Sequence, residues 1–332
     1  MEAIIAIIGC GRIARRHAQQ AKKYGRLIAV CDIVAEKAAS FAAEYGANAY
    51  TSLTEMLEKE PLINILSVCT PNGLHAEQTI EGLNTGKHVL CEKPMCLSEA
   101  DGRKMINAVG NNRLFIVKSA RYNPLLMQLK EVIREKTLGK IFSFHLNCSW
   151  NRTEAYYKDG WRGTLDMDGG TLFTQFSHYI DIMLWLFGDC RQMKGYRKNL
   201  HHSDIIEFED TGVISLEMEN CSVGSIHYSV NAFYKNQEIS LNILAENGTL
   251  KLGGEYLNKV IYEEPGIFKE AAEATEAAND YGFYRGSMSN HDKVYEHMIR
   301  ALNGQDHHIT DGPEAMRTVA FIEEFYKNTP VT

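Results

Sequence analysis

The sequence predicts an α/β fold with a parallel sheet in its N-terminal part, followed by an α+β domain with an open, mainly antiparallel sheet. Up to residue 119, short apolar runs alternate with helical segments, which is the pattern of a parallel sheet with right-handed crossovers. Beyond that residue, strand-like runs follow one another across short turns. A chain of 332 residues is long enough for two domains. We place them at 1–119 and 120–332 and allow for the C-terminal helix packing back on the first.

The first predicted strand, residues 3–8, runs directly into the glycine-rich turn GCGRIA at residues 9–14. Gly9 permits a tight turn, Gly11 lets a pyrophosphate approach the backbone, and Ala14 keeps the next helix close to the strand. That helix, over 13–24, would direct its free N–H groups at the diphosphate. The pattern predicts a Rossmann-type dinucleotide site, with Gly9, Gly11, Arg12 and Ile13 as candidate contacts.

A second apolar run, residues 27–31, ends at Asp32, twenty-one residues after Gly11. A carboxylate at this place is expected to bind the ribose hydroxyls of the adenosine. Ile33 and Val34 follow it, so no Arg or Lys stands there to neutralise a 2′-phosphate. The sequence therefore favours NAD over NADP.

The remaining elements follow from periodicity and turn signals. In the first domain we expect strands at 47–50, 63–68, 88–91 and 114–117, and helices at 34–45, 52–57, 73–83 and 98–109. In the second we expect helices at 124–135, 172–187, 288–302 and 313–327, and strands at 141–150, 212–218, 222–230, 238–244 and 249–252. The open face of the second sheet has to be covered, and self-association as a homodimer or homotetramer would cover it.

Composition excludes several classes of function. The net charge of −7 gives no basic surface for nucleic acid. The longest apolar stretch, 180–187, is under half a membrane span, so we expect a cytoplasmic protein that does not bind membranes. Eight cysteines show no CxxC and no metal-ligand spacing. We expect reduced, structural cysteines and no metal.

Ligands of open parallel sheets bind beyond the carboxyl ends of the strands, so the residues there are candidates for the site. One strand is followed by Thr70, Pro71, Asn72 and His75, and another by Glu92, Lys93 and Pro94. The ammonium group of Lys93 can orient a substrate hydroxyl or transfer its proton. The alternative for a single lysine is a solvated surface charge.

His178 is predicted on the helix 172–187, after Gly169 and Gly170, which would let backbone or ligand approach closely. Asp181 is three residues further on the same helical face and could orient the imidazole. A lone helical histidine can also be an ordinary core residue.

The segments GCGRIARRH, TPNGLH, GKHVLCEKP and GGTLFTQFSHYID resemble the glucose-fructose oxidoreductase / inositol dehydrogenase (Gfo/Idh/MocA) family over essentially the whole chain. The resemblance implies a Rossmann domain, an open mixed sheet that often mediates dimers or tetramers, and NAD(P)-dependent oxidation of a sugar or polyol carbon. It maps Lys93 and His178 onto the catalytic Lys and His, and Asn72, His75 and Glu92 onto the cofactor loops.

One position departs from that resemblance. Many members carry Asp four residues before the histidine, where this chain has Thr174. A hydroxyl can hydrogen-bond a substrate oxygen but does not supply a carboxylate's charge. Lys93 and His178 would then share the proton transfer, and assignment to inositol dehydrogenase itself is weakened.

The segment NRTEAYYKDGWRGTLDMDGG is similar to the branch that contains UDP-N-acetylglucosaminuronate 3-dehydrogenases. Its arginines would suit a carboxylate or phosphate and its aromatic rings a sugar or base, although an ordinary aromatic loop cluster is an equal alternative. Trp161 and Arg162 also count among the candidate cofactor contacts. The candidate substrate contacts are Arg121, Tyr122, Arg152, Tyr156, Tyr157, Thr174, Asp181, Tyr284, Asn290 and His291.

The sequence thus predicts an NAD-dependent oxidoreductase that oxidises a secondary hydroxyl of a sugar or sugar derivative, with a UDP-sugar acid as one candidate. The alternatives are a simple sugar or polyol dehydrogenase, a glycosidase that recycles bound NAD, and a non-catalytic regulator that senses dinucleotide or sugar. The presence of both Lys93 and His178 argues against the regulator, because a sensor needs no proton acceptor.

Overall fold

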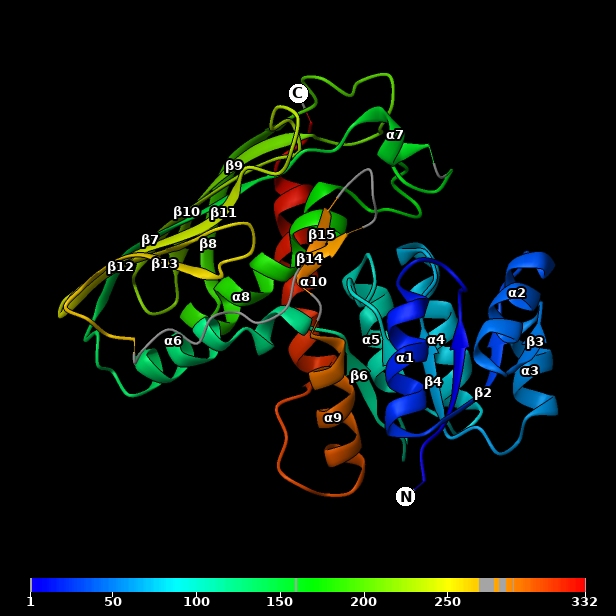
Figure 1. Ribbon diagram of the computed structural model, residues 1–332. Coiled ribbons are helices and arrows are strands. Elements are labelled where there is room, and N and C mark those ends of the chain that lie inside the picture. The colour runs from blue at the N-terminus through cyan, green and yellow to red at the C-terminus, as the bar shows by residue number, and fades with distance from the viewer. Residues whose placement is uncertain (1, 159, 269–277, 281–284, 289, 332) are drawn as a thin grey trace. The chain divides into compact units, whose positions relative to one another are not determined.

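The computed structural model describes residues 2–158, 160–268, 278–280, 285–288 and 290–331. The chain forms two compact units (Figure 1). The first unit comprises Met1–Lys118 and His291–Val319, and the second comprises Ser119–Asn290 and Ala320–Thr332. This division differs from the predicted one in that His291–Val319 belongs to the first unit.

The first unit is built on a seven-stranded sheet in the order β16-β6-β5-β4-β1-β2-β3. Six strands are parallel, in the order of a doubly wound dinucleotide-binding fold, and β16 is antiparallel to β6. The predicted Rossmann architecture is confirmed. The strands are β1 (Ile4–Ile8), β2 (Arg26–Cys31), β3 (Asn48–Tyr50), β4 (Ile65–Val68), β5 (His88–Cys91), β6 (Leu114–Ile116) and β16 (Thr310–Asp311).

The helices of the first unit begin and end at local signals. Ser52 and Ser98 cap α3 and α5 by accepting hydrogen bonds from the backbone N–H groups of Glu55 and Asp101, and Gly46 ends α2 in the left-handed conformation. Helix α9 packs on α1, two segments far apart in the sequence. The helices are α1 (Ala14–Tyr24), α2 (Ala35–Tyr45), α3 (Leu53–Lys59), η1 (Asn72–Leu74), α4 (His75–Asn84), α5 (Glu99–Asn107) and α9 (His291–Leu302).

The second unit contains another seven-stranded sheet, in the order β13-β12-β11-β7-β10-β9-β8. Only β7 and β10 pair in parallel, so the predicted mainly antiparallel sheet is confirmed. The predicted strands omitted β8 and β13. The strands are β7 (Ile141–Ser149), β8 (Cys190–Lys198), β9 (Thr211–Met218), β10 (Val223–Ser229), β11 (Glu238–Ala245), β12 (Gly248–Gly253) and β13 (Lys259–Glu264), with a small hairpin of β14 (Ala278–Asp280) and β15 (Arg285–Met288).

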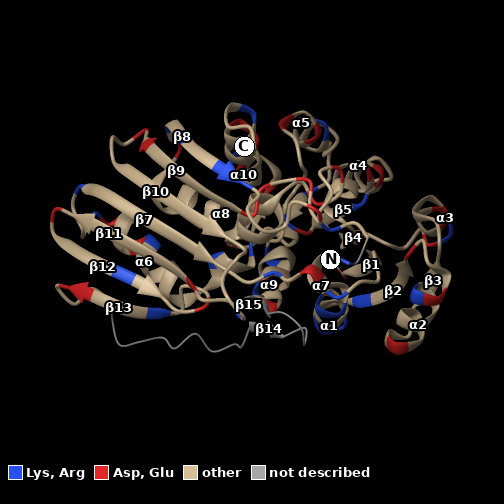
Figure 2. Ribbon diagram, turned by 90° about the horizontal axis from the view of Figure 1, so that it is seen from above, with Lys and Arg blue, Asp and Glu red and all other residues tan. Residues whose placement is uncertain are grey.

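Helices cover one face of this sheet (Figure 1). Phe144 of β7 stacks on Phe187 with ring centroids 4.3 Å apart, and Trp150 contacts Phe176. The central strands β7 and β10 contain no Lys, Arg, Asp or Glu, as Figure 2 shows. The helical elements are η2 (Ser119–Tyr122), α6 (Pro124–Arg134), α7 (Glu154–Tyr157), the π-helical turn η3 (Leu172–Phe176), α8 (Ser177–Phe187) and α10 (Gly312–Asn328), whose last residues belong to this unit.

The opposite face of the sheet presents polar side chains in a hydrogen-bonded ladder. Nδ1 of His145 lies 2.9 Å from the hydroxyl of Ser225, and Nδ1 of His227 lies 2.7 Å from the amide oxygen of Asn147. The amide nitrogen of Asn147 donates to Glu238. None of the helices in the described part of the chain is long and apolar enough to span a membrane.

Candidate functional site

The turn after β1 is shaped by two glycines with different surroundings. Gly9 has φ +89°, and a Cβ atom there would lie 2.8 Å from the backbone of Cys69 and Thr70, so only glycine lets the end of β1 lie against the end of β4. A Cβ atom on Gly11 would meet nothing within 4 Å. The turn therefore has open space beside Gly11, as the predicted close approach of a dinucleotide diphosphate requires.

Asp32 is fixed beside this turn. Its Oδ2 atom accepts a hydrogen bond from the backbone N–H of Cys10 and its Oδ1 atom accepts one from that of Val34, both at 2.9 Å. Each carboxylate oxygen can accept a further hydrogen bond, as binding of ribose hydroxyls requires. Ile33, the next residue, is 88% exposed. Burial, and then the charge of Asp32, raises the pKa of the Cys10 thiol to about 12, so the thiol is uncharged in the turn.

The loops after β4 and β5 are joined by His75. Its Nδ1 atom lies 2.7 Å from the carbonyl oxygen of Pro94, and its Nε2 atom lies 2.9 Å from that of Thr70. The hydroxyl of Thr70 also donates to Gln78 at 2.6 Å. Asn72 is buried in η1 of the same loop. His75 thus holds the segment around Lys93 next to the predicted cofactor loop.

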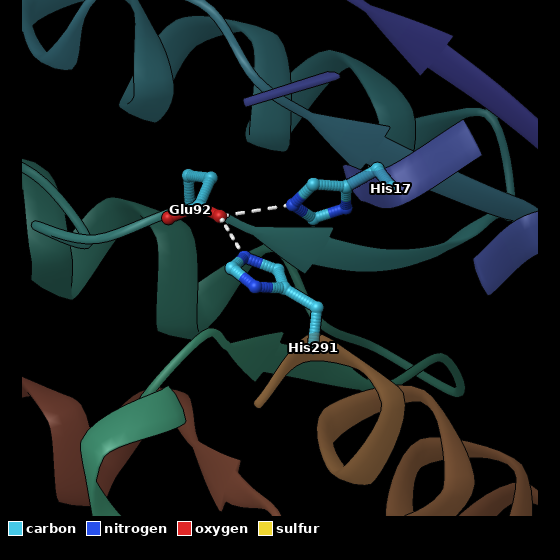
Figure 3. A group of neighbouring side chains, drawn as sticks. All are labelled: His17, Glu92 and His291. Atoms are coloured by element: carbon cyan, nitrogen blue, oxygen red, sulfur yellow. Dashed lines mark hydrogen bonds and ion pairs between the residues drawn. The ribbon is translucent and has the colours of Figure 1, made fainter. Parts of the chain in front are cut away.

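The carboxylate of Glu92 is the centre of a buried hydrogen-bond network (Figure 3). Its Oε1 atom accepts from Nε2 of His17 at 2.9 Å and from Nε2 of His291 at 3.0 Å. Its Oε2 atom accepts from the backbone N–H of Lys93 at 3.0 Å. Burial opposes the charge of Glu92, but the two imidazole hydrogen bonds outweigh it and hold the pKa well below its usual range. Glu92 is therefore an anion that fixes the backbone of the predicted catalytic lysine.

The network extends from His17 to β4. Nδ1 of His17 lies 3.0 Å from the hydroxyl of Tyr295, which lies 2.9 Å from the hydroxyl of Ser67. One proton assignment satisfies every contact, because Ser67 can donate to Tyr295, Tyr295 to Nδ1 of His17, and Nε2–H of His17 to Glu92. Burial lowers the pKa of His17, which agrees with a neutral ring.

His17, Glu92 and His291 also have the ligand types of a divalent-metal site, with donor atoms within 4.8 Å of one another. However, the Nε2 atoms of His17 and His291 both lie within hydrogen-bond distance of Glu92, and each can donate a proton to that carboxylate. We therefore interpret the group as a hydrogen-bond network. His17 was not predicted as a site residue. His291, predicted as a substrate contact, hydrogen-bonds Glu92, and its role toward substrate stays a prediction.

His178 is buried in the first turn of α8, after the π-helical turn η3. Of the two glycines before it, Gly170 has φ +122°, and a Cβ atom there would lie 2.6 Å from the hydroxyl of Tyr326. That hydroxyl accepts a hydrogen bond from the backbone N–H of Leu172 at 2.9 Å. The glycine pair was predicted to let backbone or ligand approach closely, whereas at Gly170 the group that approaches is the side chain of Tyr326.

Asp181 and Arg121 form a buried, bidentate ion pair. Nε of Arg121 donates to Oδ2 of Asp181 at 2.7 Å, and Nη2 donates to Oδ1 at 2.9 Å. The guanidinium also lies 5.5 Å from the ring centroid of Trp185. The pair ties η2 to α8. The predicted roles of Asp181 toward His178 and of Arg121 toward substrate stay predictions.

Arg152 is buried among aromatic rings in the second unit. Its Nε atom donates to Gln175 at 2.7 Å, and Nη1 donates to Asn236 at 3.1 Å. The amide of Gln175 donates in turn to the hydroxyl of Tyr156 at 2.8 Å. These contacts are those of a packed cluster. Tyr156 and Tyr157 belong to its core together with Ile206 and Phe208.

Arg162 covers the edge of this cluster. Its guanidinium lies 4.6 Å from the ring centroid of Tyr156 and 4.9 Å from that of Trp161. Arg162 and Trp161 are half-buried, unlike Arg152. Trp161 and Arg162 are therefore the predicted contact residues of this cluster whose side chains keep solvent-accessible surface.

The remaining predicted residues are spread over the second unit. Thr174 lies in η3, and its hydroxyl contacts Asp168. Tyr122 is buried in η2, and the side-chain amide of Asn290 donates to the backbone carbonyl of Ser119 at 3.0 Å. Tyr284 lies outside the described residues. Asp168 was not predicted, since no spacing in the sequence connects it to Thr174.

Comparison with known proteins adds a family and several relatives. Residues 4–118 match a family model described as "Oxidoreductase family, NAD-binding Rossmann fold", and residues 126–251 match one described as "GFO/IDH/MocA C-terminal domain". The chain is 31% identical to the WlbA dehydrogenase from Bordetella pertussis, solved with NADH and UDP-GlcNAcA, with a TM-score of 0.87 and coverage of 99% of this chain and 96% of that one. The chain is 33% identical to WlbA from Chromobacterium violaceum, solved with the same two ligands. The TM-score is 0.90, and the match covers 98% of this chain and 93% of that one.

The curated relatives match over a smaller part of their length. Glucose-6-phosphate 3-dehydrogenase of Bacillus subtilis is 32% identical over 192 residues, which are 55% of this chain and 53% of that protein. Oxidoreductase P35 of Formosa agariphila is 28% identical over 57% of this chain and 61% of its own length. The chain thus spans less than two thirds of these two proteins.

Proposed function

The chain belongs to the Gfo/Idh/MocA family of oxidoreductases with an NAD-binding Rossmann fold, and from this premise we propose that it oxidises a ring hydroxyl of a UDP-linked sugar acid. The observation that carries the substrate class is the similarity to the two WlbA dehydrogenases, which extends over nearly the full length of both chains. The half-buried pair of Trp161 and Arg162 supports it, because a guanidinium and an indole suit the carboxylate or phosphate and the ring of such a ligand.

The first unit offers residues that fit NAD. The open space at Gly11 suits the diphosphate, and the fixed carboxylate of Asp32 suits the ribose hydroxyls. A bound NAD would supply the hydride acceptor for the carbon that carries the reacting hydroxyl. The chain's own part is proton transfer. The hydroxyl proton would pass to the neutral amine of Lys93 or to His178 as the C–H and O–H bonds break and the carbonyl forms.

Self-association is part of the proposal. The polar ladder on the outer face of the second sheet, which includes His145, Asn147 and Ser225, offers donors and acceptors to a second copy of the chain. A homodimer or homotetramer would cover this face.

The test is the near-ultraviolet absorbance of reduced nicotinamide after NAD is mixed with UDP-N-acetylglucosaminuronate. Free sugars, an inositol and glucose 6-phosphate serve as parallel samples. Absorbance that rises only with the UDP-sugar supports the proposal, and a rise with another sample moves the enzyme to the simpler sugar dehydrogenases. If NAD binds but the absorbance rises with none of the samples, the result favours an enzyme that recycles its bound cofactor or a non-catalytic regulator.

A further inference from the structure

Helix α9 brings two buried polar side chains into the network around Glu92. His291 and Tyr295 lie one turn apart on this helix, which packs on α1 within the first unit, and they are 4% and 0% exposed. His291 donates from Nε2 to Oε1 of Glu92 at 3.0 Å (Figure 3). The hydroxyl of Tyr295 lies 3.0 Å from Nδ1 of His17 and 2.9 Å from the hydroxyl of Ser67. Helix α9 thus reaches the carboxylate directly and through His17.

The charge of Glu92 fixes the direction of these hydrogen bonds. Burial opposes that charge, but the imidazole hydrogen bonds hold the pKa of Glu92 well below its usual range, so its carboxylate only accepts. Nε2 of His17 therefore carries the proton, and Nδ1 of the neutral ring accepts one from Tyr295. Burial raises the pKa of the Tyr295 hydroxyl well above its usual value, so that hydroxyl keeps the proton it donates. Tyr295 thus selects the tautomer of His17 that bonds to Glu92.

The other carboxylate oxygen of Glu92 reaches Lys93. Oε2 accepts the backbone N–H of Lys93 at 3.0 Å. The last torsion of a glutamate side chain is soft, so this oxygen keeps its place only while Oε1 is held as well. Oε1 is held by His17 on α1 and by His291 on α9. The position of the Lys93 backbone therefore depends on donors that helix packing brings to Glu92.

We propose that His291 and Tyr295 are positioning residues for Lys93. Both act through the carboxylate of Glu92, which His291 contacts directly and Tyr295 contacts through His17. Helix α9 is then part of the proton-transfer site, although it comes from the C-terminal part of the sequence. The inference rests on the proposed function only in giving Lys93 a part in the reaction. The hydrogen bonds themselves need no substrate.

The first experiment compares Tyr295→Phe with Ser67→Ala. Tyr295→Phe removes the proton that His17 accepts, whereas Ser67→Ala leaves it in place, because Ser67 donates to Tyr295. We expect kcat to fall on the order of tenfold in Tyr295→Phe and by about twofold at most in Ser67→Ala, with the Kd for NAD unchanged in both. Tyr24→Phe is the matched control, because the Tyr24 ring stacks on that of Tyr295, and it should keep full turnover. Equal losses in Tyr295→Phe and Ser67→Ala would contradict the donor direction and overturn the role of Tyr295.

The second experiment follows the backbone N–H of Lys93 in the protein without substrate. Nitrogen-15-labelled lysine gives its amide signal, assigned with Lys93→Arg. We expect Tyr295→Phe and His291→Leu each to speed hydrogen exchange of this amide on the order of tenfold, because its hydrogen bond to Glu92 loosens. His291→Gln keeps a side-chain N–H for Glu92 and should retain the slow exchange of the wild type.

A third comparison combines Tyr295→Phe with Glu92→Gln. Substitutions that act through one hydrogen-bond network are not additive. If Tyr295 acts through Glu92, the double variant should lose little more kcat than Glu92→Gln alone. A Tyr295 that only stabilises the helix packing would instead give a double variant in which the two losses multiply.

The outcomes separate the two proposals. Unchanged exchange of the Lys93 amide in Tyr295→Phe, or losses that multiply in the double variant, overturns the positioning role. If Tyr295→Phe fails to fold, the pair His291→Leu and His291→Gln carries the test, and equal exchange in these two variants overturns the role. If the wild type oxidises no sugar but the amide exchange responds as expected, the substrate proposal fails and the link from α9 to Lys93 stands.

Discussion

Two buried carboxylates, one in each unit, are held by different kinds of partner. In the first unit, Glu92 accepts hydrogen bonds from two imidazole rings, His17 and His291. In the second unit, Asp181 is paired with the guanidinium of Arg121. An imidazole changes its charge near neutral pH, whereas a guanidinium keeps its charge at any pH that a protein tolerates. The comparison teaches that the charge of Glu92 depends on hydrogen bonds from imidazole rings, whereas that of Asp181 depends on the cation of Arg121.

The largest effect is expected at Lys93, whose backbone is fixed by Glu92. Lys93→Ala should lower kcat by roughly 10²–10⁴-fold, because general acid–base groups contribute about that much. Binding of NAD, measured by quenching of protein fluorescence, should change little. Lys22→Ala, on the exposed face of α1, is the control and should keep full turnover. Near-normal turnover of Lys93→Ala would refute the catalytic role.

The ion pair of the second unit gives the next effect. Arg121→Ala leaves the carboxylate of Asp181 buried without its cation, and such a loss costs about 3–5 kcal/mol of unfolding free energy. Arg103→Ala removes an exposed partner of Glu99 instead, with 71% of the arginine side chain accessible, and should cost about 1 kcal/mol or less. Urea unfolding of both variants makes the comparison. Equal costs would mean that burial of the Arg121 pair has no energetic consequence.

Substitutions at the two glycines of the dinucleotide turn distinguish an effect on folding stability from an effect on NAD binding. Gly9→Ala introduces a Cβ atom 2.8 Å from the Cys69 backbone at φ +89°. It should lower the unfolding free energy by about 1–3 kcal/mol. Gly11→Ala meets nothing within 4 Å, so it should leave stability unchanged and weaken NAD binding. Thermal unfolding and NAD titration of both variants test this, and normal NAD affinity in Gly11→Ala would place the diphosphate elsewhere.

The features that the sequence predicted are local ones. The strand, the GxGxxA turn, the helix and Asp32 follow one another within the first 32 residues, so their order alone indicates the Rossmann unit. Strand β8 escaped prediction because charged and polar residues such as Arg191, Lys194 and Lys198 stand on its exposed positions and dilute the apolar alternation. Residues 291–319 were assigned to the second domain, since the packing of α9 on α1 leaves no local signal.

The same distinction holds for the candidate site. Lys93 and Glu92 could be predicted because they follow a buried strand. His17 could not, since a histidine on the buried face of α1 has the spacing of a core residue, and its partners His291 and Tyr295 come from the other end of the chain. The departure at Thr174 is visible in the sequence. Its contact with Asp168 depends on two positive φ angles that the sequence only suggests through its glycines.

The smallest effect concerns the pH response of Glu92. Because its pKa in the folded protein is held well below the usual value of 4.5, Glu92 stabilises the fold at higher pH, and that contribution is lost as pH falls below about 4.5. Glu92→Gln should therefore be less stable than the wild type near neutral pH, and the difference should shrink on acidification by at most about 1.4 kcal/mol per pH unit. Urea unfolding at a series of pH values measures this, with the exposed Glu36→Gln as control. A difference that stays constant with pH would mean that Glu92 is no more anionic in the folded chain than in the unfolded one, and the contrast between the imidazole-held and guanidinium-held carboxylates would fail.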